Sequence, residues 1–324
     1  MRLFTRRIFT AALLAAVPFT SALAQDNFPS RPIKIVVPFP PGGGSDMVAR
    51  MLANGMREKL GQPVLVDNKA GAGTVIGTDM VAKSPADGYT ILWMATPFGI
   101  NASLLKSLPY DTLKDFTPVI DLVEMPLVMI VHPSSPAKNV KEFIELAKKE
   151  PGKLSYGSSG NGGSPHLAME IFKTATGTSL THVPYRGSAP SVQDLIAGQT
   201  DVVMDTTILV APHVRAGKAR ALAQSGSKRS SYLPDVPTMQ EEGVAGYEVT
   251  SWMSLAVPAG TPNAVVQKLN EAAKAVFTAP AMREQLSKQG LDVIAGTPED
   301  SARRLRVEID KWAKAIQTSG AKPD

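Results

Sequence analysis

Apolar and polar positions along this chain switch repeatedly between two periods. Short runs rich in β-branched residues, which are typical of buried strands, lie at residues 33–37, 63–67, 90–94, 126–131, 154–156, 180–183, 201–204 and 219–223. Between these runs, apolar residues recur three or four positions apart, as they do on one face of a helix. Strands that alternate with helices in this way predict an α/β protein, in which largely parallel sheets are covered by helices on both faces.

A long amphipathic helix is predicted near the C-terminus. Leu305, Ile309, Trp312 and Ile316 form an apolar stripe along it. The sequence Thr-Pro-Glu at 297–299 is a helix start signal, because threonine caps a helix and proline is tolerated in its first turn.

Two segments repeat one pattern and indicate two similar lobes. In each, an extended run ends at a proline and a second proline opens the next helix, at Pro133 and Pro136 and again at Pro258 and Pro262. We interpret the extended stretches just before them, at 121–126 and 247–251, as two crossings between the lobes. Residues 25–124 and 250–324 then form lobe 1, which is discontinuous, and residues 125–249 form lobe 2.

The N-terminus has the pattern of a secretory signal peptide. Arg2, Arg6 and Arg7 precede an apolar stretch at 8–17, and Ala-Leu-Ala at 22–24 is a small-residue cleavage site. We expect cleavage after Ala24, which leaves 300 of the 324 residues as an exported, soluble periplasmic protein. The adjacent arginines also fit a twin-arginine signal, so the export route stays open.

Composition excludes several kinds of partner. The whole chain carries a net charge of +5, of which the leader's three arginines account for three, so the mature chain keeps about +2. That charge is too small to indicate nucleic-acid binding. There is no cysteine, and the four histidines lack the spacing of paired metal ligands. We expect a monomer without a cofactor or a metal.

Two glycine-rich turns, each following a predicted strand and preceding a predicted helix, are the strongest functional signal. The first glycine turn is Pro-Phe-Pro-Pro-Gly-Gly-Gly-Ser-Asp at 38–46, and the second is Gly-Ser-Ser-Gly-Asn-Gly-Gly-Ser at 157–164. Glycine lets the backbone approach a ligand, and the first turn of a helix has N–H groups without an intrahelical partner. Each turn is a candidate anion site.

Several ordered blocks carry a family resemblance over essentially the whole mature chain. Besides the two turns, they include Asn-Lys-Ala-Gly-Ala-Gly at 68–73, Asp-Gly-Tyr-Thr at 87–90, His-Val-Pro-Tyr-Arg-Gly at 182–187 and Leu-Pro-Asp-Val-Pro-Thr at 233–238. The chain resembles the periplasmic solute-binding proteins of the tripartite tricarboxylate transporter (Bug) family. The resemblance implies a two-lobed periplasmic-binding-protein fold of the second type, a small carboxylate ligand and a two-component membrane permease as partner.

The residues themselves suggest how such a carboxylate would be held. Burying an anion without compensation is costly, and uncharged N–H and hydroxyl groups can replace its hydration. We expect the donors to be backbone and hydroxyl groups of the two turns, at Gly42, Gly43, Gly44 and Ser45 and at Ser158, Ser159, Gly160 and Asn161. Converging from opposite lobes, they would close the cleft around one ligand.

Other residues have weaker claims on the site. Asp46 is expected to organise the first turn, by capping its helix or accepting a loop N–H, since its charge would repel an anion. The remaining candidates for the cleft wall are Phe39, Pro41, Thr74, His166, Tyr185, Asp205, Thr206 and Thr207. Phe39 would equally pack beneath the turn, and a histidine such as His166 more often satisfies its own loop. Arg186 is a possible carboxylate clamp, although turn arginines are usually solvated.

Two functions other than transport remain open. A periplasmic sensor subunit would use the same cleft and dock on a membrane kinase. A serine hydrolase would need Ser159 as nucleophile and His166 as base, but the sequence identifies no orienting acid, and position 161 lacks the glycine of a nucleophile elbow. The first turn also lacks the spacing of a nucleotide-binding loop.

Overall fold

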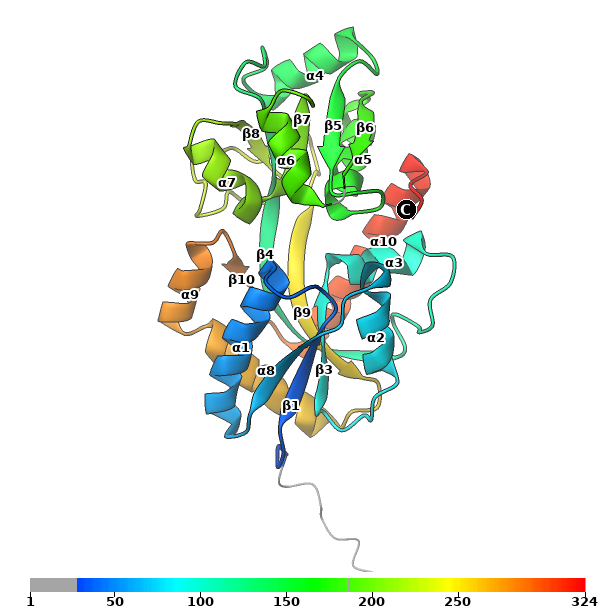
Figure 1. The fold of residues 1–324 in the computed structure, drawn as a ribbon, viewed down its shortest axis with the longest axis vertical. Coiled ribbons are helices and arrows are strands. Elements are labelled where there is room, and N and C mark those ends of the chain that lie inside the picture. Colours follow the sequence, from blue (N-terminus) through cyan, green and yellow to red (C-terminus); the bar gives the residue numbers. More distant parts are fainter. Residues whose placement is uncertain (1–27, 186, 324) are drawn as a thin grey trace, which may run out of the picture.

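The computed structural model describes residues 28–185 and 187–323. In this part of the chain, helices and strands build two lobes joined by long strands (Figure 1). The predicted leader at 1–24 lies outside the described residues. No helix in the described ranges combines the length and the apolar content that crossing a bilayer requires.

The first lobe is a sheet with helices on both faces. Its strands are β1 (Ile33–Val37), β2 (Val64–Asn68), β3 (Thr90–Ala95), β9 (Thr250–Pro258) and β10 (Asp292–Val293). Its helices are α1 (Gly44–Leu60), the 3-10 turn η1 (Ala72–Thr74), α2 (Val75–Ala82), α3 (Thr96–Leu104), α8 (Asn263–Phe277) and α9 (Pro280–Ser287). β1 lies between β2 and β3 and is parallel to both, so alternate residues of β1 enter separate cores.

The second lobe repeats this arrangement. Its strands are β5 (Ser155–Ser158), β6 (Thr181–Pro184), β7 (Val202–Thr206) and β8 (Arg220–Gln224). Its helices are α4 (Val140–Lys149), α5 (Ser164–Thr176), α6 (Ser188–Ile196) and α7 (Thr207–Arg215). β5 lies between β6 and β7 and is parallel to both. The predicted strands of both lobes are therefore present, with ends that differ by one or two residues.

One long strand, β4 (Phe116–Val131), belongs to both lobes. Up to Pro126 it pairs with β9 of the first lobe, and from Leu127 it pairs with β7 and β8 of the second. The sequence predicted only its second part, because prolines and acidic residues interrupt the apolar pattern of the first. The change of partner follows the stretch at 121–126 that the sequence suggests as a crossing.

Both sheets are mixed, whereas the alternation of strands and helices predicted largely parallel ones. β4 runs antiparallel to β9, β7 and β8, and β9 runs antiparallel to β3. The physical reason is that β4 leads from the first lobe to the second and β9 leads back, so the two strands pair in opposite directions.

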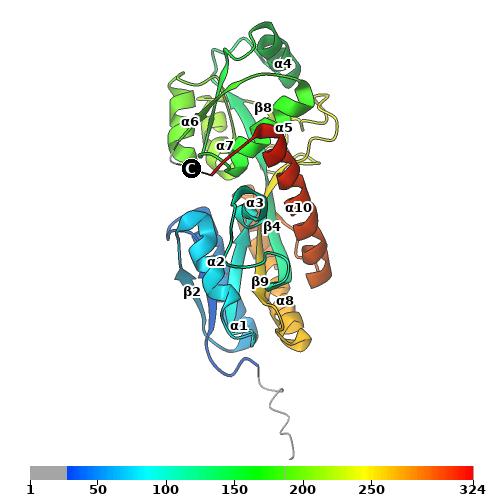
Figure 2. The same cartoon turned by 90° about the vertical axis from the view of Figure 1, so that its right-hand side faces the viewer.

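The helix α10 (Pro298–Ser319) lies along both lobes (Figure 2). It begins with a capping box, in which Thr297 and Asp300 exchange side-chain and backbone hydrogen bonds, and this confirms the predicted start of the helix. Leu305 packs in a first-lobe core, whereas Trp312 and Ala315 pack in the core of the second lobe. α10 therefore bridges the lobes beside the crossing strands.

Candidate functional site

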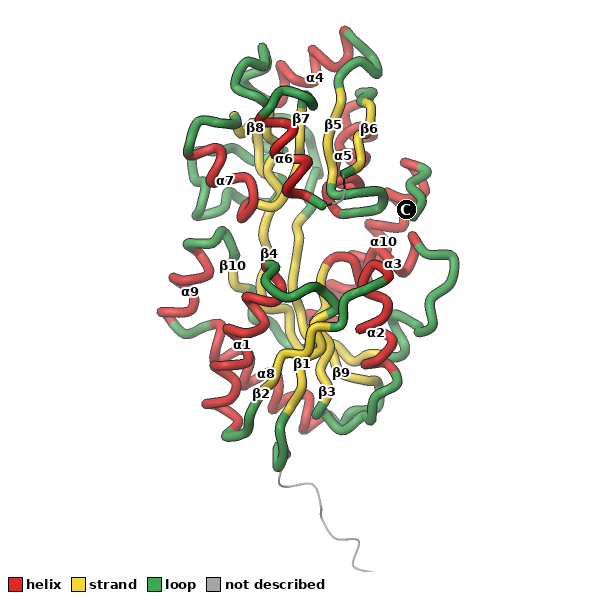
Figure 3. Tube along the Cα trace, in the orientation of Figure 1, coloured by secondary structure: helices red, strands yellow, loops and turns green. Residues whose placement is uncertain are grey.

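The carboxyl ends of the parallel strands in each lobe face the other lobe (Figure 1). The helices that follow these strands therefore begin at the gap between the lobes: α1, α2 and α3 from the first lobe, and α5, α6 and α7 from the second. In open α/β sheets, ligands bind in the crevice at this end of the strands. Figure 3 shows the loops after β1 and β5, in green, at these facing ends.

The first glycine turn presents free backbone to the gap. α1 begins at Gly44, and its N-cap residue Gly43 is extended, with φ −82° and ψ 173°, and has no side-chain cap. A Cβ atom on Gly43 would come no closer than 3.8 Å to any other atom, and one on Gly44 would meet none within 4 Å. Both glycines are exposed and Ser45 is half-buried, so the first N–H groups of α1 can meet a ligand.

Asp46 shapes this turn from within. Its carboxylate accepts the Gly42 N–H at 2.9 Å and pairs with Arg50 one helical turn later, at N–O distances of 2.9 and 3.0 Å. The hydrogen bonds from Arg50 and Gly42 lower the pKa of the Asp46 carboxyl from 3.8 to about 2. The loop-organising role predicted for Asp46 is therefore present, and the expectation that the Gly42 N–H faces a ligand is wrong.

Arg50 extends the network under the turn. Its guanidinium donates to Oδ1 of Asn68 at 3.0 Å, and Nδ2 of Asn68 donates to the Phe39 carbonyl at 3.1 Å. Phe39 is half-buried and packs against the first-lobe core. Phe39 thus supports the turn from below, while Pro41 is exposed beside the glycines.

The third glycine-rich loop places Thr74 at the start of α2. Thr74 has a positive φ of 85° and is 7% exposed, and its Oγ1 lies 3.3 Å from the Nδ2 atom of Asn101 in α3. Nδ2 of Asn101 also donates to the Gly73 carbonyl at 2.7 Å. Asn101 therefore fixes this loop to α3, a partner that no sequence spacing indicated.

The second glycine turn is partly occupied with its own hydrogen bonds. Ser158 is fully buried, and its Oγ lies 2.6 Å from Nε2 of His182 and accepts the Gly160 N–H at 3.2 Å. Both groups therefore take part in hydrogen bonds within the lobe, and their roles as ligand donors stay a prediction. Ser159 and Asn161 are half-buried and remain the candidates there.

The second turn also touches the first lobe. A Cβ atom on Gly162, which has φ +71°, would lie 2.3 Å from Cδ2 of Leu104 at the end of α3. Beyond this contact, Gly163 is the extended N-cap of α5, without a side-chain cap. The start of α5 therefore lies at the contact between the lobes.

His166 takes the role that histidines near loops more often have. Its Nδ1 accepts the Gly162 N–H at 3.0 Å, and its Nε2 lies 3.9 Å from Oε1 of Glu170. A serine hydrolase needs an imidazole nitrogen ready to take a proton from the nucleophile. The Nδ1 atom of His166 is already occupied by the turn.

Tyr185 and Arg186 are the candidates in the loop after β6. Tyr185 is half-buried and donates to Asp194 at 2.7 Å; burial and the Asp194 carboxylate raise the pKa of Tyr185 to about 12. Arg186 lies outside the described residues. Its part in the site stays a prediction.

The Asp-Thr-Thr stretch after β7 has three different surroundings. Asp205 is 1% exposed and accepts the Thr206 N–H at 2.7 Å, and burial raises the pKa of its carboxyl. Thr206 is half-buried at the start of α7. Thr207 is fully buried and donates to the Pro126 carbonyl at 2.8 Å, so its hydroxyl is engaged within the protein and its contact with a ligand stays a prediction.

Two further helices, which no motif in the sequence indicated, begin at the same crevice. α3 begins directly after β3, and α6 begins after the loop that follows β6. Both helices follow strands that the sequence predicted. The order of strand and helix was therefore the signal that could have placed these helix starts at the crevice. Among the described residues, no cluster of His, Asp or Glu side chains is placed to hold a metal ion.

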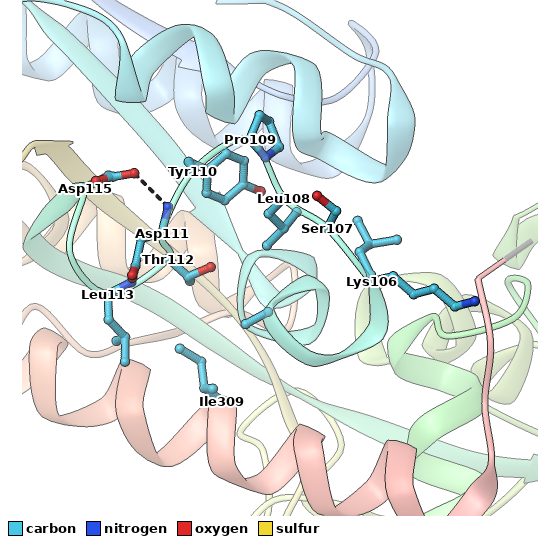
Figure 4. Close-up of a pocket in the computed structure, with 12 residues that line it drawn as sticks. Lys106, Ser107, Leu108, Pro109, Tyr110, Asp111, Thr112, Leu113, Asp115 and Ile309 are labelled. Atoms are coloured by element: carbon cyan, nitrogen blue, oxygen red, sulfur yellow. Dashed lines mark hydrogen bonds between the residues drawn. The ribbon is translucent and has the colours of Figure 1, made fainter.

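One cavity is lined by residues outside both turns. It measures about 670 Å³ and is lined by the loop between α3 and β4, including Leu108, Tyr110 and Thr112, and by Ile309 of α10 (Figure 4). None of the candidate residues lines it. This cavity therefore gives no support to the predicted site, and the glycine turns remain the candidate.

Comparison with known proteins gives a consistent result. A model described as the tripartite tricarboxylate transporter family receptor matches residues 48–321. The periplasmic binding protein BugD is 37% identical and superposes with a TM-score of 0.77, covering 92% of this chain and 100% of the other.

Two similar structures contain bound carboxylates. Rpa4515 of R. palustris with adipate is 37% identical, with a TM-score of 0.80 over 92% of this chain and 100% of the other. MatC of Rhodopseudomonas palustris with malate is 32% identical, with a TM-score of 0.76 over 89% and 100%. These structures confirm the predicted α/β fold of the periplasmic-binding-protein type.

Proposed function

The chain belongs to the tripartite tricarboxylate transporter receptor family, and we propose that it captures a small carboxylate between its two lobes and delivers it to a membrane permease. The family resemblance carried by the sequence blocks is thereby confirmed. As a member of a family of solute-binding proteins, it acts by binding. The proposal extends this to the ligand class, the permease partner and the periplasmic location.

One observation carries the proposal: helices from both lobes begin at the same gap, and three of them, α1, α5 and α6, start from glycines without a side-chain cap. Gly43 precedes α1 and Gly163 precedes α5, and neither helix start has a side-chain cap. A helix N-terminus stabilises an anion by about 0.3–1 kcal/mol when exposed and up to ~2 kcal/mol when partly buried. Helix starts on opposite lobes favour an anion that touches both.

The charges near the first turn are compatible with an anionic ligand. Asp46 is the acid closest to the free N–H groups in sequence, and Arg50 balances its charge within the turn. Because this carboxylate is already paired and hydrogen-bonded, its repulsion of a bound carboxylate is reduced. The turn can therefore offer neutral donors without a net negative charge beside them.

Known ligands of relatives support the ligand class. Rpa4515 contains adipate and MatC contains malate, and both are aliphatic dicarboxylates. We extend to this chain only the shared group, a carboxylate, because the two ligands differ in chain length and only malate carries a hydroxyl group. We take the ligand to be a mono- or dicarboxylate.

Gly43→Val and Ser159→Val test whether the two glycine turns bind the carboxylate. Gly43 has a negative φ and open space around its missing Cβ, so valine there should fold normally but cover the N–H groups at the start of α1. Ser159→Val removes a hydroxyl in the second turn. We expect calorimetric affinity for adipate or malate to fall at least about tenfold for each variant, a loss on the order of 1.4 kcal/mol.

The matched control is Ser179→Val, since Ser179 is exposed in the same lobe but precedes β6, at the end of the strand away from the gap. Thermal stability should also be measured with adipate, malate and the neutral diamide of adipic acid. Stabilisation and binding by carboxylates with unchanged affinity in both turn variants would remove these turns from the site. Stabilisation by neutral or cationic compounds alone would contradict the proposed ligand class.

A further inference from the structure

A buried cluster of aromatic and charged side chains supports the second glycine turn. His166 and His182 lie face to face, with ring centroids 4.0 Å apart and ring planes 3° apart. The ring of Tyr156 lies against that of His182, with centroids 4.7 Å apart. These residues come from α5, β6 and β5, the elements around the turn.

Both imidazoles contact polar groups of the turn, His166 a backbone N–H and His182 the Ser158 hydroxyl. Nδ1 of His166 accepts the Gly162 N–H at 3.0 Å, and Nε2 of His182 lies 2.6 Å from the Ser158 hydroxyl, which accepts the Gly160 N–H. An imidazole nitrogen accepts an N–H only when it carries no proton of its own. The first of these bonds therefore requires His166 to be neutral, with its proton on Nε2.

Among the described residues, titratable groups of β5 and α5 lie against the pair. The Tyr156 hydroxyl donates to Glu170, and Nζ of Lys173 lies 2.7 Å from the same carboxylate. Burial and the Glu170 carboxylate raise the pKa of Tyr156, so this group stays protonated. The Glu170 carboxylate pairs with Lys173 and accepts from Tyr156, and its Oε1 lies 3.9 Å from Nε2 of His166.

Protonation of His166 conflicts with the observed turn in two ways. A proton on Nδ1 would face the Gly162 N–H, so two donors would meet where one bond exists now. The positive charge would also lie against the stacked ring of His182 in a buried site, where His166 is 5% exposed, and like or desolvated charges are disfavoured there. Charging the pair therefore favours a rearranged turn.

We propose that the stacked His166–His182 pair positions the second glycine turn and makes carboxylate binding weaken on acidification. The inference rests on the proposed function, because it assigns the turn to the ligand site. The ordered turn requires neutral His166, so the ligand-bound protein binds fewer protons at this pair than the free protein. Affinity is then complete above the titration point of the pair and falls as the pH drops through it, by up to about tenfold per pH unit.

The test uses His166→Asn in the full-length mature protein. The Asn side-chain oxygen can accept the Gly162 N–H in place of Nδ1 but does not titrate. Calorimetric titrations with adipate and with malate between about pH 8 and about pH 5 should show a falling affinity for the wild type. His166→Asn should show a flat profile over the same range, because position 166 then has no imidazole to take up a proton.

His213→Asn is the matched control, because His213 lies half-buried on α7 and outside the site. It should keep the wild-type profile. A pH slope retained in His166→Asn, a flat wild-type profile, or tighter wild-type binding in acid would each overturn the inference. Failure of both carboxylates to bind at the upper pH would instead contradict the proposed function.

A second readout needs no ligand. Nitrogen-detected NMR of histidine-labelled wild-type protein should find His166 with its proton on Nε2, and the Gly162 amide signal should shift with the same pH midpoint as the imidazoles. A proton on Nδ1 of His166 at about pH 8 would overturn the inference, and so would a Gly162 chemical shift that does not change with the imidazole titration. Both results are obtained with the wild-type protein, so they do not depend on the folding of any variant.

Discussion

Residues of the two glycine turns differ in whether their polar groups are already used. Gly42, Ser158 and Gly160 direct their hydrogen-bonding groups into the turns, whereas the N–H groups that follow Gly43 have no cap. Sequence alone assigned all of them one role, because the partner of Ser158 lies on β6, 24 residues away. The glycines could be predicted from sequence, and the bonds of Gly42 to Asp46 and of Gly160 to Ser158 are local, but the contact of Ser158 with His182 depends on the tertiary fold.

Asp46 gives a prediction about stability in acid. Its pKa of about 2 in the folded protein lies below the ordinary value of 3.8, so ionised Asp46 stabilises the fold. This stability is present above about pH 4 and is lost as the pH falls towards about 2. Asp46→Asn should therefore lower the free energy of unfolding at neutral pH by about 1–2 kcal/mol, allowing for the solvent around Arg50.

Urea unfolding at several pH values measures this effect, and Asp79→Asn is the control. Asp79 pairs with Lys83 at 2.7 Å in the same i,i+4 arrangement, but Lys83 is more exposed than Arg50. We expect a loss below about 0.5 kcal/mol for the control. Equal losses in the two variants would show that the Gly42 and Arg50 bonds add nothing to an ordinary helix pair.

Thr206 and Thr207 form a natural pair of variants at the start of α7. Thr207→Val removes the bond to the Pro126 carbonyl in a fully buried site, so we expect a loss of about 1–3 kcal/mol in stability with little change in affinity. Thr206→Val should weaken binding with little change in stability, since Thr206 is half-buried at the crevice. Chemical denaturation and calorimetry of both variants would contradict this assignment if the effects were exchanged.

At the scale of elements, the sequence predicted strands and helices better than their pairing. The start of α10 follows from a local signal, the capping box at Thr297, and was found. The length of β4 was not predicted, because Pro126 and the acidic residues before it interrupt the apolar pattern by which a buried strand is recognised. Local chemistry is readable from sequence, whereas a strand shared by two sheets depends on distant partners.

Glu308 joins α10 to the crossing strands and gives a prediction at this scale. Its carboxylate is 4% exposed and accepts the indole N–H groups of Trp252 in β9 and Trp312 in α10, each at 2.9 Å. Glu308→Leu would leave two buried N–H groups without an acceptor, so we expect a loss of about 2–5 kcal/mol in the free energy of unfolding.

Urea unfolding compares this variant with Glu284→Leu, whose side chain is exposed on α9. The control should change stability by less than about 0.5 kcal/mol. A small loss for Glu308→Leu would mean that the link between α10 and β9 is not held by this carboxylate.

At the scale of the whole molecule, the same features serve both the fold and the proposed capture. β4, β9 and α10 connect the lobes, while the helices that carry the site begin on either side of the gap. A ligand that contacts both lobes would favour the conformation in which they are closest, since a ligand shifts an equilibrium only by its preference for one state. The connection between lobes and the position of the helix starts together suit a protein that closes on its ligand.

The crystal structure of the mature protein with a carboxylate that stabilises it, adipate or malate, is the most direct test. We predict one carboxylate group in the gap, accepting N–H groups from residues 43–45 and from the turn that contains Ser159, directly or through one water. A carboxylate bound elsewhere, or held by a lysine or arginine side chain while both glycine turns remain empty, would contradict the account.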